Sequence, residues 1–128
     1  MKFHHIGIAT KDIDKTLDWV SSQFKVIGVS NKVYDKNQDA YLQMIETSDM
    51  NIELVSGNIV KNFIERKITY YHVCYEVRDI EKSILEFEKS MVISKPKEAL
   101  LFDNRRVAFL MTPIGIIELL EFKKLSNS

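Results

Sequence analysis

The sequence has one cysteine, no excess of charge of either sign and no long apolar run, and each shortage excludes a class of protein. A single thiol, Cys74, closes no internal disulfide. The 18 Lys and Arg residues balance the 18 Asp and Glu residues, so no net field attracts nucleic acid or an anionic membrane surface. No apolar run approaches the roughly 20 residues needed to span a bilayer, and nothing suggests export. We therefore expect a cytoplasmic protein that binds neither nucleic acid nor membrane.

The composition that remains is that of an ordinary globular protein. The chain has 128 residues, of which 45% are hydrophobic and 28% are charged. This length suffices for one domain with its own core, but not for two independent domains.

An internal repeat is the most informative feature of the sequence. "FHHIGIATKDID" near the N-terminus resembles "YYHVCYEVRDIE" later in the chain. An offset of 67 residues superposes His5 on His72 and Asp12 on Asp79. The two halves also end alike, because "NIELV" matches "IIELL" at an offset of 65. A unit of about 65 residues that occurs twice indicates a duplicated module rather than a solenoid.

Each half shows the same succession of hydrophobic periods. A short apolar strand comes first, and Asp12 or Asp79 then stands where a carboxylate can cap a helix. The apolar residues that follow recur at helical spacing: Ile13, Leu17, Val20 and Phe24 in the first half, and Ile80, Ile84, Phe87 and Met91 in the second. Strand-like runs complete each half, at about 26–34, 40–46 and 51–56 and at about 92–97, 105–112 and 115–122.

This order predicts an α+β protein built from two βαβββ modules. We expect a single domain over residues 1–128, with module 1 at 3–57 and module 2 at 69–122. Residues 58–68 carry apolar residues at helical spacing and are interpreted as a helix that links the modules.

Four residues at equivalent points of the repeat are candidates for a site. Side chains alternate along a strand, so His5 shares a face with the very small Gly7, which leaves space in front of the histidine. Glu53 and Glu118 lie between aliphatic residues on the last strand of each half and face away from them. If the modules pair about an approximate two-fold axis, His5, Glu53, His72 and Glu118 converge on one centre.

Two imidazoles and two carboxylates suit a divalent metal ion of intermediate hardness. Such a set leaves up to two octahedral positions open, where a substrate could bind through two oxygens. The ion would then stabilise negative charge on one of them as a Lewis acid. Mixed nitrogen and oxygen ligands do not choose among Zn, Ni, Co, Mn and Fe.

Structural explanations compete with this hypothesis residue by residue. A single histidine in an apolar strand is commonly a hydrogen-bonded core residue, and a glutamate between aliphatic residues commonly marks the exposed face of a strand. The register of all four residues with the duplication favours the metal site. His4 has no histidine counterpart in the second half, so we do not expect it to be a ligand, and we interpret Cys74 as a small core residue.

The motifs "HHIGIATKDID", "IELVS", "YHVCYEVRDIE" and "NRRVAFLMTPIGIIELLE" resemble the vicinal oxygen chelate superfamily, also called the glyoxalase/bleomycin-resistance fold. The resemblance covers about 3–122. It implies two βαβββ modules paired about a pseudo-two-fold axis into a cupped mixed sheet. It also implies metal ligation by His5, Glu53, His72 and Glu118, and a homodimer.

Within this superfamily the sequence is most similar to methylmalonyl-CoA epimerase and next to glyoxalase I, the lactoylglutathione lyase. The epimerases carry a further catalytic carboxylate on the strand before the first-half ligand. Here that stretch is "AYLQMIE", in which Tyr41, Leu42 and Gln43 take the corresponding positions and Glu46 comes later. The second acid is therefore either missing or supplied by Glu53.

The resemblance implies a metal-dependent enzyme that works through a stabilised enolate on a small-molecule substrate. We expect Glu118 to be a ligand and the proton acceptor, with Glu53 on the other side of the substrate carbon. An acyl-CoA thioester would be epimerised, and a glutathione adduct would be isomerised as in lactoylglutathione lyases. A metal-free binding protein for drugs or other small molecules is the third hypothesis, although a pure binder does not need the ligand set.

Overall fold

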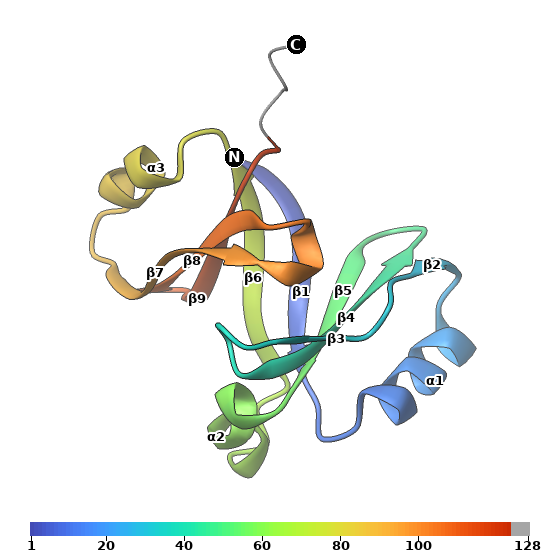
Figure 1. The fold of residues 1–128 in the computed structure, drawn as a ribbon. Coiled ribbons are helices and arrows are strands. Elements are labelled where there is room, and N and C mark those ends of the chain that lie inside the picture. The colour runs from blue at the N-terminus through green and yellow to red at the C-terminus, as the bar shows by residue number, and fades with distance from the viewer. Residues whose placement is uncertain (124–128) are drawn as a thin grey trace.

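Two long antiparallel strands, β1 (Lys2–Ala9) and β6 (Tyr70–Val77), form the centre of the structure (Figure 1). The computed structural model describes residues 1–123. Each central strand begins one half of the chain, and the remaining strands of that half extend the sheet on its own side. The sheet is strongly curved, so its inner face is a cup.

The first half continues with one helix, four strands and a short helical connection. These elements are α1 (Ile13–Gln23), β2 (Val26–Val29), β3 (Val33–Asp35), β4 (Ala40–Thr47), β5 (Asn51–Ser56), η1 (Asn58–Val60) and α2 (Lys61–Glu65). The second half is built in the same way, without a counterpart of the three-residue strand β3. Its elements after β6 are α3 (Ile80–Glu86), β7 (Met91–Ala99), η2 (Leu100–Phe102), β8 (Arg105–Thr112) and β9 (Gly115–Glu121).

The pairing of the strands repeats about the centre of the sheet. The order is β2-β4-β5-β1-β6-β9-β8-β7, with β3 paired to β4 outside this path. The last strand of each half lies parallel to its first strand, β5 beside β1 and β9 beside β6. The predicted α+β class, with two βαβββ units joined in a cupped mixed sheet, is confirmed.

The helices α1 and α3 cover the outer face of the sheet on opposite sides of the molecule (Figure 1). In the first half Ile13 and Val20 of α1 pack with Ile52 and Leu54 of β5. In the second, Ile80 of α3 packs against strands β8 and β9. Since side chains alternate along a strand, Glu53, which lies between Ile52 and Leu54, faces the inside of the cup.

Both helices begin where the sequence predicts. The carboxylate of Asp12 accepts a hydrogen bond from the backbone N–H of Lys15 at 3.1 Å, and that of Asp79 accepts one from Lys82 at 3.0 Å. Each aspartate therefore satisfies one of the N–H groups that the first helical turn leaves without a partner.

Two predicted boundaries were wrong. The helical stripe of the second half ends early, because α3 stops at Glu86 and Met91 already belongs to strand β7. Lys89, between them, has the left-handed φ of 54°, which no helix interior accommodates. The expected strand at 26–34 is split into β2 and β3. The linking segment is helical over η1 and α2, as the spacing predicts.

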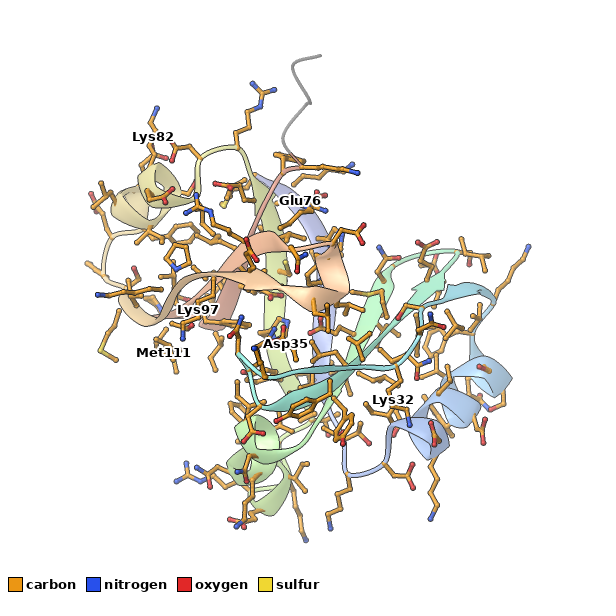
Figure 2. The ribbon with its side chains drawn as sticks, in the orientation of Figure 1. Lys32, Asp35, Glu76, Lys82, Lys97 and Met111 are labelled. Carbon is orange, nitrogen blue, oxygen red and sulfur yellow. The ribbon has the colours of Figure 1, made fainter. Side chains whose placement is uncertain are left out.

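The turn after β3 joins the two halves inside the cup. Asp35 is buried, and its carboxylate accepts hydrogen bonds from the backbone N–H of Asn37 and from that of Leu100 in the second half (Figure 2). The side-chain amide of Asn37 also donates to the backbone carbonyl of Glu98. These bonds hold the η2 turn of the second half against the first half.

Within residues 1–123, none of the helices has the length and apolar character required to cross a membrane.

Removal of a helix cap should destabilise the protein without altering the site. We expect Asp12→Ala to lower the free energy of unfolding by about 1 kcal/mol, because the Lys15 N–H loses its acceptor. Asp12→Asn is the matched control, since an asparagine side chain caps equally well. Urea denaturation of the three proteins measures the difference. Equal stability of the alanine and asparagine variants would contradict the capping role.

Candidate metal centre

The four central strands each contribute one of the residues singled out by the repeat. Strand β5 carries Glu53, β1 carries His5, β6 carries His72 and β9 carries Glu118, in this spatial order across the sheet. All four side chains point into the cup and are at most 5% exposed. The structure therefore brings together residues that are up to 113 positions apart, from His5 to Glu118.

The strand register arranges these residues in two rows. Gly7 of β1 lies between Glu53 and His72, because it pairs with both. Cys74 of β6 lies in the same way between His5 and Glu118. A small residue in the middle of each row allows the longer side chains on either side to converge above it.

At Gly7 the structure leaves no room for a side chain. A Cβ atom at this position would overlap the imidazole ring of His72. The space that the sequence predicts in front of His5 is thus occupied by the ring of the other histidine. The absence of a side chain at Gly7 lets the two imidazoles approach, and their Nε2 atoms lie 3.1 Å apart.

The ligand atoms converge on a common point. Glu118 Oε1 lies 3.0 Å from His5 Nε2 and 3.1 Å from His72 Nε2. Glu53 Oε1 lies farther from them, at 3.7 and 3.5 Å. One ligand atom from each of the four side chains lies within 4.8 Å of all the others. These four residues therefore form a cluster that could hold a metal ion.

The separations between the ligand atoms are compatible with ligation of one divalent ion. Two atoms bound to one ion at about 2.0–2.2 Å lie about 2.8–3.6 Å apart for right-angled to tetrahedral geometry. Among the distances that join a histidine nitrogen to another ligand atom, only that of 3.7 Å between His5 and Glu53 exceeds this range. Glu118 Oε1 lies close to both histidine nitrogens, yet within the described residues it has no hydrogen-bond partner.

The ionisable groups of the site alter one another's pKa values. Burial raises the pKa of Glu53, and the neighbouring Glu118 raises it further. Burial acts in the same direction on Glu118, but His72 and His5 outweigh it and hold the pKa of this carboxyl below its usual range. Burial also opposes protonation of His5, yet Glu53 and Glu118 prevail and raise its pKa. Two carboxylates at this depth are costly unless a positive charge neutralises them.

Two additional side chains enter the cup through irregularities in the central strands. The pairing of β1 with β6 shifts register between Phe3 and His5, where His4 has no partner on β6, and again between Gly7 and Ile8, where Tyr71 has no partner on β1. At each shift one residue is left unpaired, and simple alternation then fails. His4 and Tyr71 consequently lie on the same side as the histidines that follow them, and both make ring contacts with those histidines.

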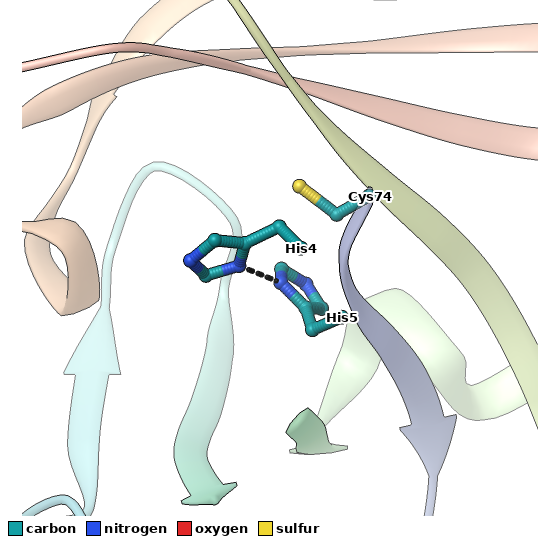
Figure 3. Close-up of side chains that lie close together, drawn as sticks. All are labelled: His4, His5 and Cys74. Carbon is teal, nitrogen blue, oxygen red and sulfur yellow. Dashed lines mark hydrogen bonds between the residues drawn. The ribbon is translucent and has the colours of Figure 1, made fainter. Parts of the chain in front are cut away.

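His4 lies outside the four-residue cluster. Its Nδ1 lies 2.7 Å from Nδ1 of His5 (Figure 3). Cys74 lies beside the two rings, and its thiol is completely buried. His4, His5 and Cys74 thus form a second group whose potential ligand atoms lie close together.

Aromatic rings cover the cluster, and no feature of the sequence revealed them. Phe102 of the η2 turn stacks on His5 with ring centres 5.6 Å apart. Phe109 of β8 meets His72 edge to face at 5.4 Å. Phe102 precedes the left-handed residues Asp103 and Asn104, and only the folded chain shows that this turn closes over the first half.

The stretch 40–46 supplies no further carboxylate to the cluster in the described structure. Met44 pairs with Glu53 and occupies the adjoining place on the inner face. Gln43 belongs to the outer face, where its amide donates to the Ser30 carbonyl at 2.8 Å. Glu46 is exposed and pairs with Asn51 at the end of the strand.

The chain belongs to the Glyoxalase/Bleomycin resistance protein/Dioxygenase superfamily, whose family model matches residues 4–109. A search of the curated proteins finds no match. Among solved structures, methylmalonyl-CoA epimerase from Mycobacterium tuberculosis is 17% identical with a TM-score of 0.80, covering 96% of this chain and 89% of its own.

Two further structures resemble the chain over nearly its whole length. A variant of Streptomyces coelicolor methylmalonyl-CoA epimerase in complex with 2-nitronate-propionyl-CoA is 18% identical with a TM-score of 0.72, and the match covers 100% of this chain and 99% of that one. A hypothetical protein from Bacillus halodurans C-125 is 25% identical with a TM-score of 0.73, covering 99% and 98%. The resemblance to the epimerases, at this identity, establishes the fold.

Filling the space at Gly7 should displace His72 and weaken metal binding. We expect Gly7→Ala to raise the Kd for Zn²⁺ at least about tenfold, because the new methyl group competes with the imidazole ring. Gly28→Ala is the matched control, since a Cβ there meets only Glu46 at an ordinary contact distance of 3.5 Å. Competition with a chromophoric chelator gives the affinities, and circular dichroism verifies the fold. Wild-type affinity in a folded Gly7→Ala protein would contradict the packing argument.

The native protein should protect its only thiol from alkylation. Burial raises the pKa of Cys74, and the carboxylates of Glu118 and Glu53 raise it further, so the neutral thiol persists where a free cysteine ionises. We expect iodoacetamide at about pH 8.5 to label the native chain at least about a hundredfold more slowly than the urea-unfolded chain. Mass spectrometry follows the reaction. A Cys74→Ser protein with the exposed Ser21→Cys substitution should react rapidly; equally rapid labelling of native wild type would refute the prediction.

Proposed function

We propose that the protein is a divalent-metal-dependent isomerase that works through an enolate, most like methylmalonyl-CoA epimerase. The observation that carries this proposal is the convergence of two imidazole nitrogens and two carboxylate oxygens within 4.8 Å in a buried cup. A binding protein that only sequesters apolar molecules has no need to bury such groups, which cost stability without a cation. The similarity in fold to the epimerases supports the same reading.

A divalent ion held by His5, Glu53, His72 and Glu118 would supply Lewis-acid stabilisation of negative charge on the carbonyl oxygen of a thioester or ketone. The chain itself must remove and return the proton on the neighbouring carbon. Glu53 and Glu118 come from opposite halves of the chain and reach the cluster from strands on either side of the central pair. Return of the proton on the opposite face inverts the carbon, and its return to the adjacent carbon isomerises a hemithioacetal.

The distances from each carboxylate to the histidine nitrogens indicate different roles for Glu118 and Glu53. Glu118 Oε1 lies 3.0 and 3.1 Å from the histidine nitrogens and is the more tightly held. Glu53 Oε1 lies 3.7 Å from His5 Nε2 and 3.5 Å from His72 Nε2, and is therefore held less closely. We therefore assign Glu118 chiefly to metal binding, and Glu53 to metal binding and proton transfer. The assignment differs from the expectation from the sequence, in which Glu118 was both a ligand and the proton acceptor.

A substrate must pass the aromatic cover to reach the cluster. A mostly apolar cleft of about 200 Å³ is lined by Tyr71 and Phe109, whose rings contact His72, together with Phe63, Ile93 and Ile116. A larger hollow of about 480 Å³ lies beside α3, but neither the four cluster residues nor the aromatic rings that contact them line it. We propose the cleft at Tyr71 and Phe109 as the entrance for the acyl group, with movement of Phe102 required to uncover His5.

Lactoylglutathione lyase activity is the alternative. It is favoured by one observation: residues 40–46 place no additional carboxylate beside the cluster, so the epimerase arrangement with a separate second acid is not reproduced. The two candidates differ in substrate, an acyl-CoA thioester or a glutathione adduct. Deuterium uptake by methylmalonyl-CoA and loss of the methylglyoxal–glutathione hemithioacetal distinguish them directly.

Replacement of the two glutamates should separate metal binding from proton transfer. We expect Glu118→Gln to lose most of the bound metal, because it removes the closer charged ligand. Glu53→Gln should retain more metal, yet lower the rate of α-proton exchange about 10²–10⁴-fold. Elemental analysis and mass-spectrometric exchange in deuterated solvent, on whichever substrate the wild type turns over, measure both quantities.

Metal removal provides the control for this experiment. Wild type treated with a chelator should lose exchange activity and recover it with Zn, Ni, Co, Mn or Fe. Unchanged exchange in a metal-loaded Glu53→Gln protein would remove Glu53 from proton transfer. Full activity of the chelator-treated, metal-free wild type would refute the proposed function itself.

A further inference from the structure

His4 lies beside the proposed metal centre because of a bulge, and the function proposed above gives it no task. Strict alternation from His5 would direct His4 to the outer face of the sheet. The register shift between Phe3 and His5 turns its side chain inward instead, where its ring meets His5 at 5.0 Å and Phe102 at 5.5 Å. Bulges that redirect a side chain next to a site commonly serve that site.

The contact between His4 and His5 is a hydrogen bond between ring nitrogens. Their Nδ1 atoms are 2.7 Å apart, so one of them carries the proton and the other accepts it. Nε2 of His5 faces the cluster, and it can bind a cation only through a free lone pair. A neutral His5 must then carry its proton on Nδ1. In that arrangement His5 donates the hydrogen bond and His4 Nδ1 accepts it.

The same distance argues against a second metal site at His4, His5 and Cys74. Two atoms bound at right angles to one ion at about 2.0–2.2 Å lie at least about 2.8 Å apart. The separation of 2.7 Å between the two Nδ1 atoms is that of a short hydrogen bond. His5 also already directs its other nitrogen at the four-residue cluster.

The duplication provides an internal comparison. Tyr71 holds the place of His4 in the second half, at the equivalent bulge, and its ring meets His72 edge to face at 4.7 Å. In the described part of the chain, Nδ1 of His72 has no hydrogen-bond partner. Apart from the contact between the two Nε2 atoms, the ring of His72 is positioned by packing on Gly7 and Phe109, whereas the ring of His5 also has the hydrogen bond to His4 at its Nδ1.

We propose that His4 is a positioning residue that accepts the Nδ1 proton of His5 and thereby keeps Nε2 of His5 free to bind the metal ion. This inference rests on the proposed metal centre. Hydrogen bonds to the second nitrogen of a ligating histidine typically contribute about 10–100-fold to metal affinity, because they set the tautomer and the direction of the ring.

Two substitutions of His4 separate its hydrogen bond from its packing. His4→Phe preserves an aromatic ring against Phe102 but removes the acceptor. His4→Asn loses the ring but can place its side-chain oxygen near the position of Nδ1. The Kd for Zn²⁺, measured by competition with a chromophoric chelator, gives the metal affinity of each protein. Long-range ¹H–¹⁵N spectra of the metal-free proteins show which nitrogen of His5 carries the proton, and thermal unfolding verifies that each variant is folded.

We expect His4→Phe to raise the Kd for Zn²⁺ about 10–100-fold and to shift His5 away from the Nδ1–H tautomer, and His4→Asn to restore both quantities to near the wild-type values. Unchanged affinity and tautomer in His4→Phe would overturn the inference, and so would equal losses in both variants. The two proposals fail separately. If wild type binds no divalent metal, the proposed function is wrong, while the tautomer of metal-free His5 still decides whether His4 accepts its proton.

Discussion

The antiparallel pairing of β1 with β6 is the constraint on which the rest of the structure depends. It places the first strands of the two halves side by side, and the parallel strands β5 and β9 then join on either side. Two rows result, Glu53–Gly7–His72 and His5–Cys74–Glu118. A shift of this register by one residue would turn one pair of ligands to the outer face. The pairing therefore determines the fold and the candidate metal centre together.

Equivalent positions in the two halves have similar places in the structure even where their residues differ. Gly7 and Cys74 are equivalent and both are small, because the longer side chains on each side must meet above them. His4 and Tyr71 are also equivalent, and each emerges from a bulge beside a cluster histidine. Their chemistry differs, since one can accept a hydrogen bond from the adjoining ring nitrogen and the other only packs against its histidine. A symmetric scaffold thus carries an asymmetric site.

Burial of this cluster opposes stability, and apolar packing on both faces of the sheet compensates for it. Two carboxylates and two imidazoles lie at most 5% exposed, with the pKa values of the carboxyls displaced in opposite directions. Ionisable groups in such surroundings cost free energy unless they are paired with opposite charge. Aliphatic side chains under α1 and α3 and the aromatic cover provide the favourable burial. Stability alone does not explain such a cluster.

The sequence by itself determined the repeat, the α+β class, both capped helices and the four residues that converge, because these follow from hydrophobic periods and from equivalence between the halves. Tertiary structure alone decided the rest. The early end of α3 at Glu86, the inward turn of His4 and the closure of Phe102 over His5 were not foreseen. Alternation assumes a regular strand, whereas a bulge arises from pairing with a partner some 70 residues away. Contacts between distant segments leave no period in the local sequence, so the side chains that support and cover the centre became visible only in the folded chain.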